Sequence, residues 1–237
     1  MPFWHQKAEF NKITKSQIPY FLSGSVLLRK KCEYIITTEV MKEDILEQIA
    51  ADYLNLCGYF TRANIKYRPS RSDPEWKGRE DGVYSDVDVI GLNPLVPPPR
   101  RVVAISCKSW QEGFWAQWEI ETIADRTRKI GGRERWKTYR ELTSPKWARA
   151  FRKKVKELTG ESSFEHWIVC TRFGDPEHEK AWTRNAEFRK NLTPHLHIVS
   201  LDRIFRETVH KIGTTPANSE LGRLIQLLKA ANPDFVS

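Results

Sequence analysis

The sequence predicts an α/β fold built on a mixed β-sheet with helices on both of its faces. Three successive segments between residues 59 and 108 have the alternating or β-branched composition of strands. A later segment, 164–171, is almost continuously apolar, which is typical of a central strand covered on both faces. Helical periodicity precedes and follows these segments, and this order of elements indicates a sheet enclosed between helices.

The first part of this pattern is a helix over 38–57. Thr38 suits an N-cap, apolar residues recur at helical spacing, and Gly58 supplies a stop. Residues 59–67 then alternate between two faces, as a strand does. The following segment, 69–82, is rich in Pro, Ser, Asp and Gly, so we expect it to form a loop.

Two more strands, 84–92 and 101–108, follow this loop and are expected to pair as a hairpin with an extended, proline-rich connection. A helix over 114–129 should end at a pair of glycines. A second, strongly basic helix is expected over 145–158 and is closed by Gly160. The predicted sheet therefore has at least three consecutive strands before these helices begin.

The last third of the chain alternates between strands and helices. The apolar strand at 164–171 is followed by a helix over 176–191 and a strand over 195–200. Helices are expected near 202–211 and 219–231. Strands that alternate with helices in this way complete a mixed sheet with helices on both sides.

The length of the chain, 237 residues, is near the upper range for one domain, so we expect one domain with additions at its ends. Residues 1–37 are assigned to an N-terminal extension because they lack clear helical periodicity. The core is assigned to residues 38–205, and residues 206–237 are expected to form a C-terminal helical extension packed on it.

The net charge of +9 is concentrated in one segment. Between residues 125 and 157 there are 13 Lys or Arg residues against four acids, so the remainder of the chain is neutral. Aromatic residues are interleaved with these cations, a combination that suits a phosphate backbone with bases nearby. A solvated helix face is the alternative explanation. The expected nucleic-acid-binding residues are Arg126, Arg133, Arg135, Lys137, Arg149, Arg152, Lys153 and Lys154.

Composition also excludes several classes of protein. No stretch approaches the roughly 20 apolar residues of a membrane helix, and no secretory signal is recognisable, so we expect a cytoplasmic protein without a membrane partner. The four cysteines include no C-x-x-C pair, which argues against a zinc ribbon and a disulfide scaffold. The absence of a G-x-x-x-x-G-K-[ST] loop argues against a nucleotide-driven motor.

Acidic and basic residues meet in the predicted hairpin. Asp88 lies within an apolar strand, where a carboxylate needs a compensating partner, and a metal ion is the natural one. By strand alternation, Asp86 shares a face with Asp88. Ser106 and Lys108 share a face of the next strand and can point toward Asp88 across the hairpin. Phosphodiester hydrolysis requires a metal that activates water and a cation that stabilises the developing charge. The carboxylate of Asp88 could hold such a metal, and Lys108 could supply the cation.

These residues resemble a known family. Asp88, a hairpin, and then Ser106-Cys107-Lys108 are similar to the PD-(D/E)xK nuclease superfamily, in particular its Mrr and Holliday-junction-resolvase-like branch. The resemblance implies a restriction-endonuclease-like fold, Mg²⁺ or Mn²⁺ as cofactor, Asp88 as a metal ligand and Lys108 as the electrostatic catalyst. It also implies an accessory role for Glu47, on the first helix, as a second ligand or catalytic residue.

The motif departs from the family pattern at Ser106, which stands where Asp or Glu is usual. A hydroxyl is a poorer ligand for a hard divalent cation than a carboxylate. Some S-x-K enzymes that this chain resembles recover the carboxylate from the following helix, about a dozen residues beyond the lysine. Twelve residues separate Lys108 from Glu121, so Glu121 is the expected migrated ligand and Glu119 its neighbouring alternative.

The function expected from this resemblance is metal-dependent endonucleolytic cleavage of DNA, with RNA left open as a substrate. One active site per chain favours a homodimer for cutting both strands of a duplex. Two alternatives stay open because of Ser106. The chain could bind nucleic acid or a partner without cleaving, or it could be a structural protein of a defence or mobile-element system that uses its N-terminal extension as a contact.

Overall fold

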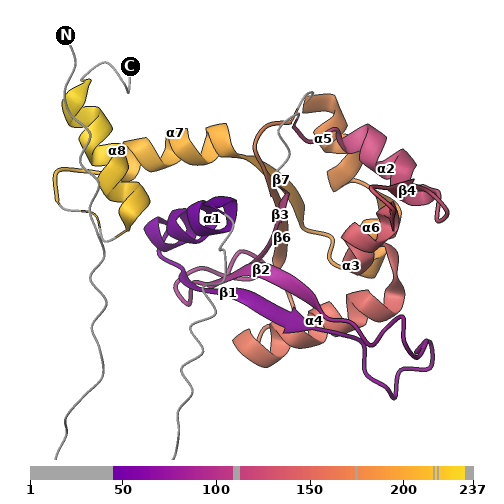
Figure 1. Cartoon of the computed structure of the whole chain (residues 1–237). Helices are drawn as coiled ribbons and strands as arrows, with labels where there is room; N and C mark the ends of the chain where they lie inside the picture. Colours follow the sequence, from indigo (N-terminus) through magenta and orange to yellow (C-terminus); the bar gives the residue numbers. More distant parts are fainter. Residues whose placement is uncertain (1–44, 109–112, 174–175, 216, 218, 233–237) are drawn as a thin grey trace, which may run out of the picture. The chain divides into compact units, whose positions relative to one another are not determined.

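A five-stranded mixed sheet is the centre of the structure (Figure 1), a computed structural model that describes residues 45–108, 113–173, 176–215, 217 and 219–232. The strand order is β1-β2-β3-β6-β7, with helices flanking the sheet. This confirms the predicted α/β class and is consistent with a restriction-endonuclease-like arrangement. The N-terminal extension assigned to 1–37, and residues 38–44 of the first predicted helix, lie outside the described residues.

The sheet combines an antiparallel half with a parallel half. Strands β1 (Phe60–Tyr67), β2 (Ser85–Leu92) and β3 (Val102–Lys108) are antiparallel neighbours. Strands β6 (Glu165–Cys170) and β7 (Leu196–Ser200) continue the sheet in parallel with β3. The predicted strands are thus all present, and β3 lies at the centre between the two halves.

One face of the sheet is covered by α1 (Ile45–Leu56) and α7 (Leu201–Lys211). The buried side chains of α1 pack there against Val89, Val103 and Ile105, and Ile204 of α7 belongs to the same cluster. The apolar stripe of α1 therefore does what its sequence periodicity predicts, because it buries one side of a helix against the sheet.

The other face is covered by α4 (Pro145–Thr159), whose Trp147, Phe151 and Val155 are buried in a second cluster with Ala104 and Ile168 of the sheet. Gly160 ends α4 with a left-handed φ of 77°, and its N–H bonds to the carbonyl of Lys156. Basic residues of this helix thus flank an apolar stripe, and the predicted helix over 145–158 is confirmed.

The helix predicted over 114–129 is shorter in the structure, where α2 spans Ala116–Ala124. The predicted end was wrong because Asp125 is extended and its carboxylate accepts hydrogen bonds from the N–H and hydroxyl of Thr127. A side chain that bonds the backbone two residues ahead stabilises a turn at the expense of another helical turn.

A short hairpin and two short helical segments follow, between the end of α2 and the start of α4. β4 (Lys129–Ile130) and β5 (Arg133–Glu134) pair across two glycines with positive φ. A 3-10 helix, η1 (Arg135–Tyr139), leads directly into α3 (Arg140–Thr143). Neither η1 nor α3 is predicted from the sequence, and both contribute residues to the site described below.

The helix predicted over 176–191 is divided into α5 (Pro176–Thr183) and α6 (Ala186–Asn191). Asn185 causes the division, because its side chain caps α6 by accepting the N–H of Phe188.

The chain ends in two helices, of which α7 continues unbroken across the expected boundary between residues 205 and 206. The last helix, α8 (Glu220–Ala231), packs against α7 through Val209, Ile212 and Ile225. It also contacts α1. Within the described part of the chain, no helix has both the length and the apolar character needed to cross a bilayer.

Candidate active site

A cleft of about 720 Å³ opens where β2 begins and β3 ends. Asp88, Ser106 and Lys108, which the sequence analysis placed together, all line this cleft. Glu141 of α3 lines it as well, although the sequence analysis did not single it out. Four further cations surround the opening: Lys129, Arg133, Lys137 and Arg140.

Asp88 lies where the two antiparallel strands separate. Pairing between β2 and β3 runs from Leu92 and Val102 as far as Val89 and Ile105, and then stops. At the next position the carboxylate of Asp88 accepts the backbone N–H of Cys107, with 2.5 Å between Oδ2 and N. The side chain therefore takes the place of a strand carbonyl, and the separation of the strands opens the cleft between them.

Strand alternation is interrupted at the same point. Val87 packs in the cluster with α4, whereas Val89 packs in the cluster with α1, although the two residues are two positions apart. Asn64, opposite Asp88 on β1, has a left-handed φ of 56°. Simple alternation therefore does not place Asp86 beside Asp88. Asp86 still lines the cleft, and its carboxylate binds Lys66 at 2.6 Å.

Lys108 is half-buried, and its Nζ lies 5.4 Å from the ring centroid of the buried Tyr139. A cation over an aromatic face is stabilised without losing its charge. Burial raises the pKa of Glu119 and Glu141 and lowers that of His166; the charge of Lys108 opposes the first two shifts and adds to the third. Lys108 is thus a positive charge held at the floor of the cleft.

Ser106 is buried and directed toward His166, with 3.2 Å between its Oγ and Nε2. His166 is fully buried under the cleft, against the ring of Phe151. Burial, followed by the positive charge of Lys108, lowers the pKa of His166 to about 3, so its imidazole is neutral at physiological pH. The hydroxyl of Ser106 is therefore engaged with a neutral ring.

Glu141 supplies a carboxylate that the S-x-K motif lacks. It is only 4% exposed, and burial raises its pKa above the usual range. The positive charge of Lys108 opposes that rise, whereas the negative charge of Asp88 adds to it. Glu141 is therefore within the electrostatic reach of both motif residues, and the two acids and the lysine form one interacting group.

The other carboxylates expected from the sequence lie elsewhere. Glu119 is buried and accepts hydrogen bonds from Nε and Nη2 of Arg135. Glu121 is exposed and bonds Gln117 on its own helix, 2.7 Å away. Glu47 is half-buried on α1, which packs on the opposite face of the sheet from α3. None of these three glutamates lines the cleft.

The chemistry of this donor set suits a hard cation that keeps part of its water shell. Among the described residues, no group of three or more His, Cys, Asp and Glu side chains is arranged to enclose a metal. Mg²⁺ commonly binds through one or two carboxylates and completes its shell with water and substrate phosphate oxygens. Asp88 and Glu141 fit that pattern: burial raises the pKa of Glu141, and the negative charge of Asp88 adds to that rise.

Several of the expected nucleic-acid-binding cations have internal partners. Arg135 pairs with Glu119, and Arg126 donates to the carbonyl of Thr143. Arg152 donates to the carbonyl of Asn191. These guanidinium groups connect neighbouring segments of the fold, so part of their hydrogen-bonding capacity is used within the protein.

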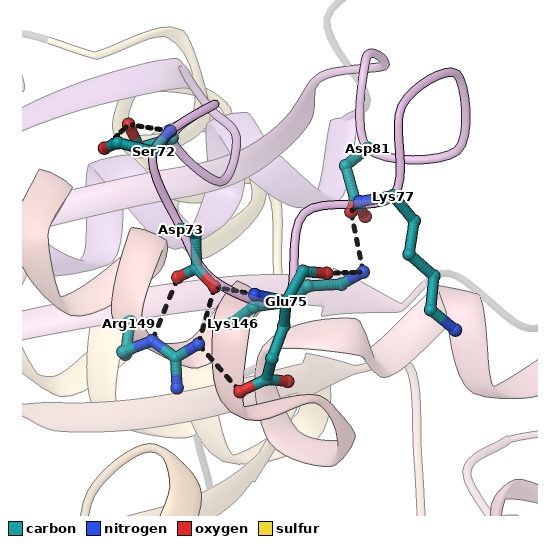
Figure 2. A network of polar contacts seen from close by, with 8 residues as sticks. Ser72, Asp73, Glu75, Lys77, Asp81, Lys146 and Arg149 are labelled. Atoms are coloured by element: carbon teal, nitrogen blue, oxygen red, sulfur yellow. Dashed lines mark hydrogen bonds and ion pairs between the residues drawn. The ribbon is translucent and has the colours of Figure 1, made fainter.

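Arg149 is the clearest case, as Figure 2 shows. Its guanidinium binds Asp73 at 2.8 Å and Glu75 at 2.9 Å, which joins α4 to the loop after β1. The four other expected cations lie in two places. Lys153 and Lys154 pair with Glu157 at the surface of α4, while Arg133 and Lys137 line the cleft.

Comparison of the chain with models of known protein families, with curated proteins and with solved structures gives no match. The fold and the cleft therefore define the class of protein by themselves. It is an α/β protein whose mixed sheet places Asp88 and Lys108 in a cleft where its antiparallel strands separate, and Glu141 of α3 lines the same cleft.

Proposed function

We propose that this chain is a Mg²⁺-dependent endonuclease of the PD-(D/E)xK kind that hydrolyses phosphodiester bonds in DNA. The observation that carries the proposal is that Asp88, Lys108 and Glu141, from three different elements, line one cleft with cations around its opening. RNA is a second candidate substrate. The proposal includes the cytoplasmic location and the homodimer expected above.

Asp88 and Glu141 are the residues that would hold the metal. Both present carboxylate oxygens, the donors that Mg²⁺ prefers, and the negative charge of Asp88 adds to the rise that burial causes in the pKa of Glu141. A divalent cation between them would offset this rise. When bound, Mg²⁺ supplies charge neutralisation at the phosphate and lowers the pKa of water.

Lys108 would stabilise the negative charge that develops on the phosphate oxygens and orient the attacking water. Its Nζ is fixed over the ring of Tyr139 and points into the same cleft as the acids. A charge that is already in place contributes more to catalysis than one that must reorganise during the reaction. Ser106 then has a positioning role, since its hydroxyl contacts His166 beneath the site.

The substrate class follows from the charges around the opening. Lys129, Arg133, Lys137 and Arg140 come from the β4–β5 hairpin and the two helical segments after it, on the side of the cleft where Glu141 lies. Cations placed around a pair of acids favour a polyanion whose scissile phosphate is drawn toward those acids.

The test is cleavage of supercoiled, linear, branched and single-stranded DNA with Mg²⁺ or Mn²⁺, and with EDTA. We expect metal-dependent cutting by the native chain and at least a roughly 100-fold loss in Asp88→Asn, Lys108→Ala and Glu141→Gln. Glu121→Gln is the matched control, because Glu121 is an exposed glutamate outside the cleft. Cutting that persists in Asp88→Asn and Lys108→Ala would remove the cleft from the reaction.

A second candidate function is binding without cleavage. The observation in its favour is Ser106, which stands in place of the usual carboxylate and is directed toward His166. This candidate predicts salt-sensitive DNA binding by the native chain without any cutting in Mg²⁺ or Mn²⁺. The same cleavage series therefore separates the two candidates.

A further inference from the structure

A second cleft, of about 490 Å³, adjoins the candidate active site. It lies between α4 and the chain that leaves β1 and enters β2. Tyr84 lines both clefts, and the ion pair between Lys66 of the second cleft and Asp86 of the first joins their walls. A ligand that occupies the first cleft and extends past Tyr84 therefore enters the second.

The second cleft is strongly basic. Seven Lys or Arg residues and two acids line it, which gives a net charge of +5. The first cleft, with five cations and four acids, has a net charge of only +1. The greater part of the positive charge on this side of the molecule thus lies beside the candidate active site, where it suits the continuing backbone of a polyanion.

Two of the seven cations build the wall of the second cleft. Lys146 is buried and binds Asp81 at 2.6 Å, and Arg149 binds Asp73 and Glu75, so both hold the loop after β1 against α4 (Figure 2). The outward-facing cations are different. Arg71 is exposed and has no acidic partner within the described residues, and the side chain of Lys153 is 72% exposed with a distant pair to Glu157.

An aromatic ring stands at the junction of the two clefts. Tyr84 is 58% exposed, and the guanidinium carbon of Arg68 lies 4.5 Å from its ring centroid. An exposed ring inside a basic concavity is the arrangement that binds unpaired nucleotides, because phosphates meet the cations while a base stacks on the ring or on the planar guanidinium. Bases within a duplex stack on one another and do not offer their faces in this way.

We propose that the second cleft binds a single-stranded segment of nucleic acid next to the scissile phosphate, with Tyr84 as its stacking residue. This inference rests on the proposed function, because it assigns that nuclease a substrate with an unpaired strand beside the cleavage point. None of Lys66, Arg68, Arg71 and Tyr84 belongs to the basic segment of the sequence, and they meet α4 only in the folded chain.

The test is fluorescence anisotropy of the full chain with a fluorescein-labelled oligothymidylate in EDTA, where no metal-dependent cutting occurs. Tyr84→Ala should weaken binding about tenfold, whereas Tyr84→Phe should bind like the native chain. Arg71→Ala combined with Lys153→Ala should reduce the slope of log affinity against log salt by about 1.4, since each lost phosphate contact to a single strand accounts for about 0.7.

Two matched controls come from elsewhere on the surface. Phe60 is 74% exposed at the opposite end of β1, so Phe60→Ala removes an exposed ring that is outside both clefts. Arg206 is exposed on α7, so Arg206→Ala removes a distant cation. Both variants should bind like the native chain. Native-like binding by Tyr84→Ala, or an unchanged salt slope in the double variant, overturns the inference.

The two proposals fail in different ways. If the native chain cuts DNA but Tyr84→Ala retains full affinity for the oligothymidylate, the second cleft is not the strand site and the nuclease assignment stands. If Tyr84→Ala loses affinity but the native chain cuts nothing, the strand site is supported and the nuclease assignment falls. A labelled duplex of the same length should bind with an affinity that Tyr84→Ala does not change, and an equal loss for duplex and single strand contradicts the stacking role.

Discussion

Glu119 of α2 and Glu141 of α3 are two buried carboxylates in the field of the same lysine, and their other partners differ. Two nitrogens of Arg135 bind Glu119. Glu141 has no cation within ion-pair distance among the described residues, and it faces a cleft that also contains Asp88. A buried acid with a matched guanidinium serves the fold, whereas a buried acid beside a second acid is suited to receive a cation.

The largest effect that separates these two glutamates is on stability. Glu119→Gln should lower the free energy of unfolding by about 3–5 kcal/mol, because it removes the charge of Glu119 from beside the largely buried guanidinium of Arg135. Glu141→Gln should leave stability unchanged or raise it, because it removes a carboxylate that burial disfavours. Urea unfolding of both variants at neutral pH measures the difference. Equal losses in the two would contradict the contrast.

A smaller effect concerns the buried His166 beneath Lys108. Its pKa of about 3 in the folded chain lies below the usual histidine value of about 6.5, so the unfolded state binds more protons between those two values. Stability should therefore fall as pH is lowered through this window, by roughly 1 kcal/mol per pH unit. Unfolding from about pH 7 to about pH 5 should show a shallower decline in His166→Gln than in the native chain. The exposed His210 provides the control, and an equal change in His210→Gln would show that His166 is not the cause.

The smallest effect distinguishes two cations of the same helix. Arg149→Ala should cost up to about 1 kcal/mol, because its pairs with Asp73 and Glu75 are partly open to solvent. Lys153→Ala should leave stability unchanged, because its pair with Glu157 is distant and exposed. Thermal unfolding of the two variants measures both. A larger loss from Lys153→Ala than from Arg149→Ala would contradict the conclusion that Arg149 stabilises the fold and Lys153 does not.

The sheet could be predicted from the sequence because its signals are local. Alternation in β1, the apolar run of β6 and the prolines between β2 and β3 each indicate an element without knowledge of the rest. Asp88 and Lys108 could be predicted to lie close together because Asp88 is on β2 and Lys108 is on β3, and these two strands form one hairpin.

Glu141 could not be found in this way. It lies in a four-residue helix after a 3-10 turn, and such short elements form because Tyr139 and Leu142 are buried by tertiary packing, not because their own propensity is high. Its position among many cations was visible in the sequence, but its burial beside Asp88 was not. The pairing of Arg149 with Asp73, 76 positions apart, was equally beyond any local signal.

The central claim is that Asp88 and Glu141 together bind a divalent cation, and Mn²⁺ titration followed by electron paramagnetic resonance tests it most directly. We predict one tight site per native chain, and Asp88→Asn and Glu141→Gln should each weaken it at least about tenfold. Glu121→Gln should bind Mn²⁺ like the native chain, because Glu121 is exposed outside the cleft. Native-like Mn²⁺ binding by Glu141→Gln, with a loss in Glu121→Gln, would contradict this claim and would identify Glu121 of α2 as the second ligand.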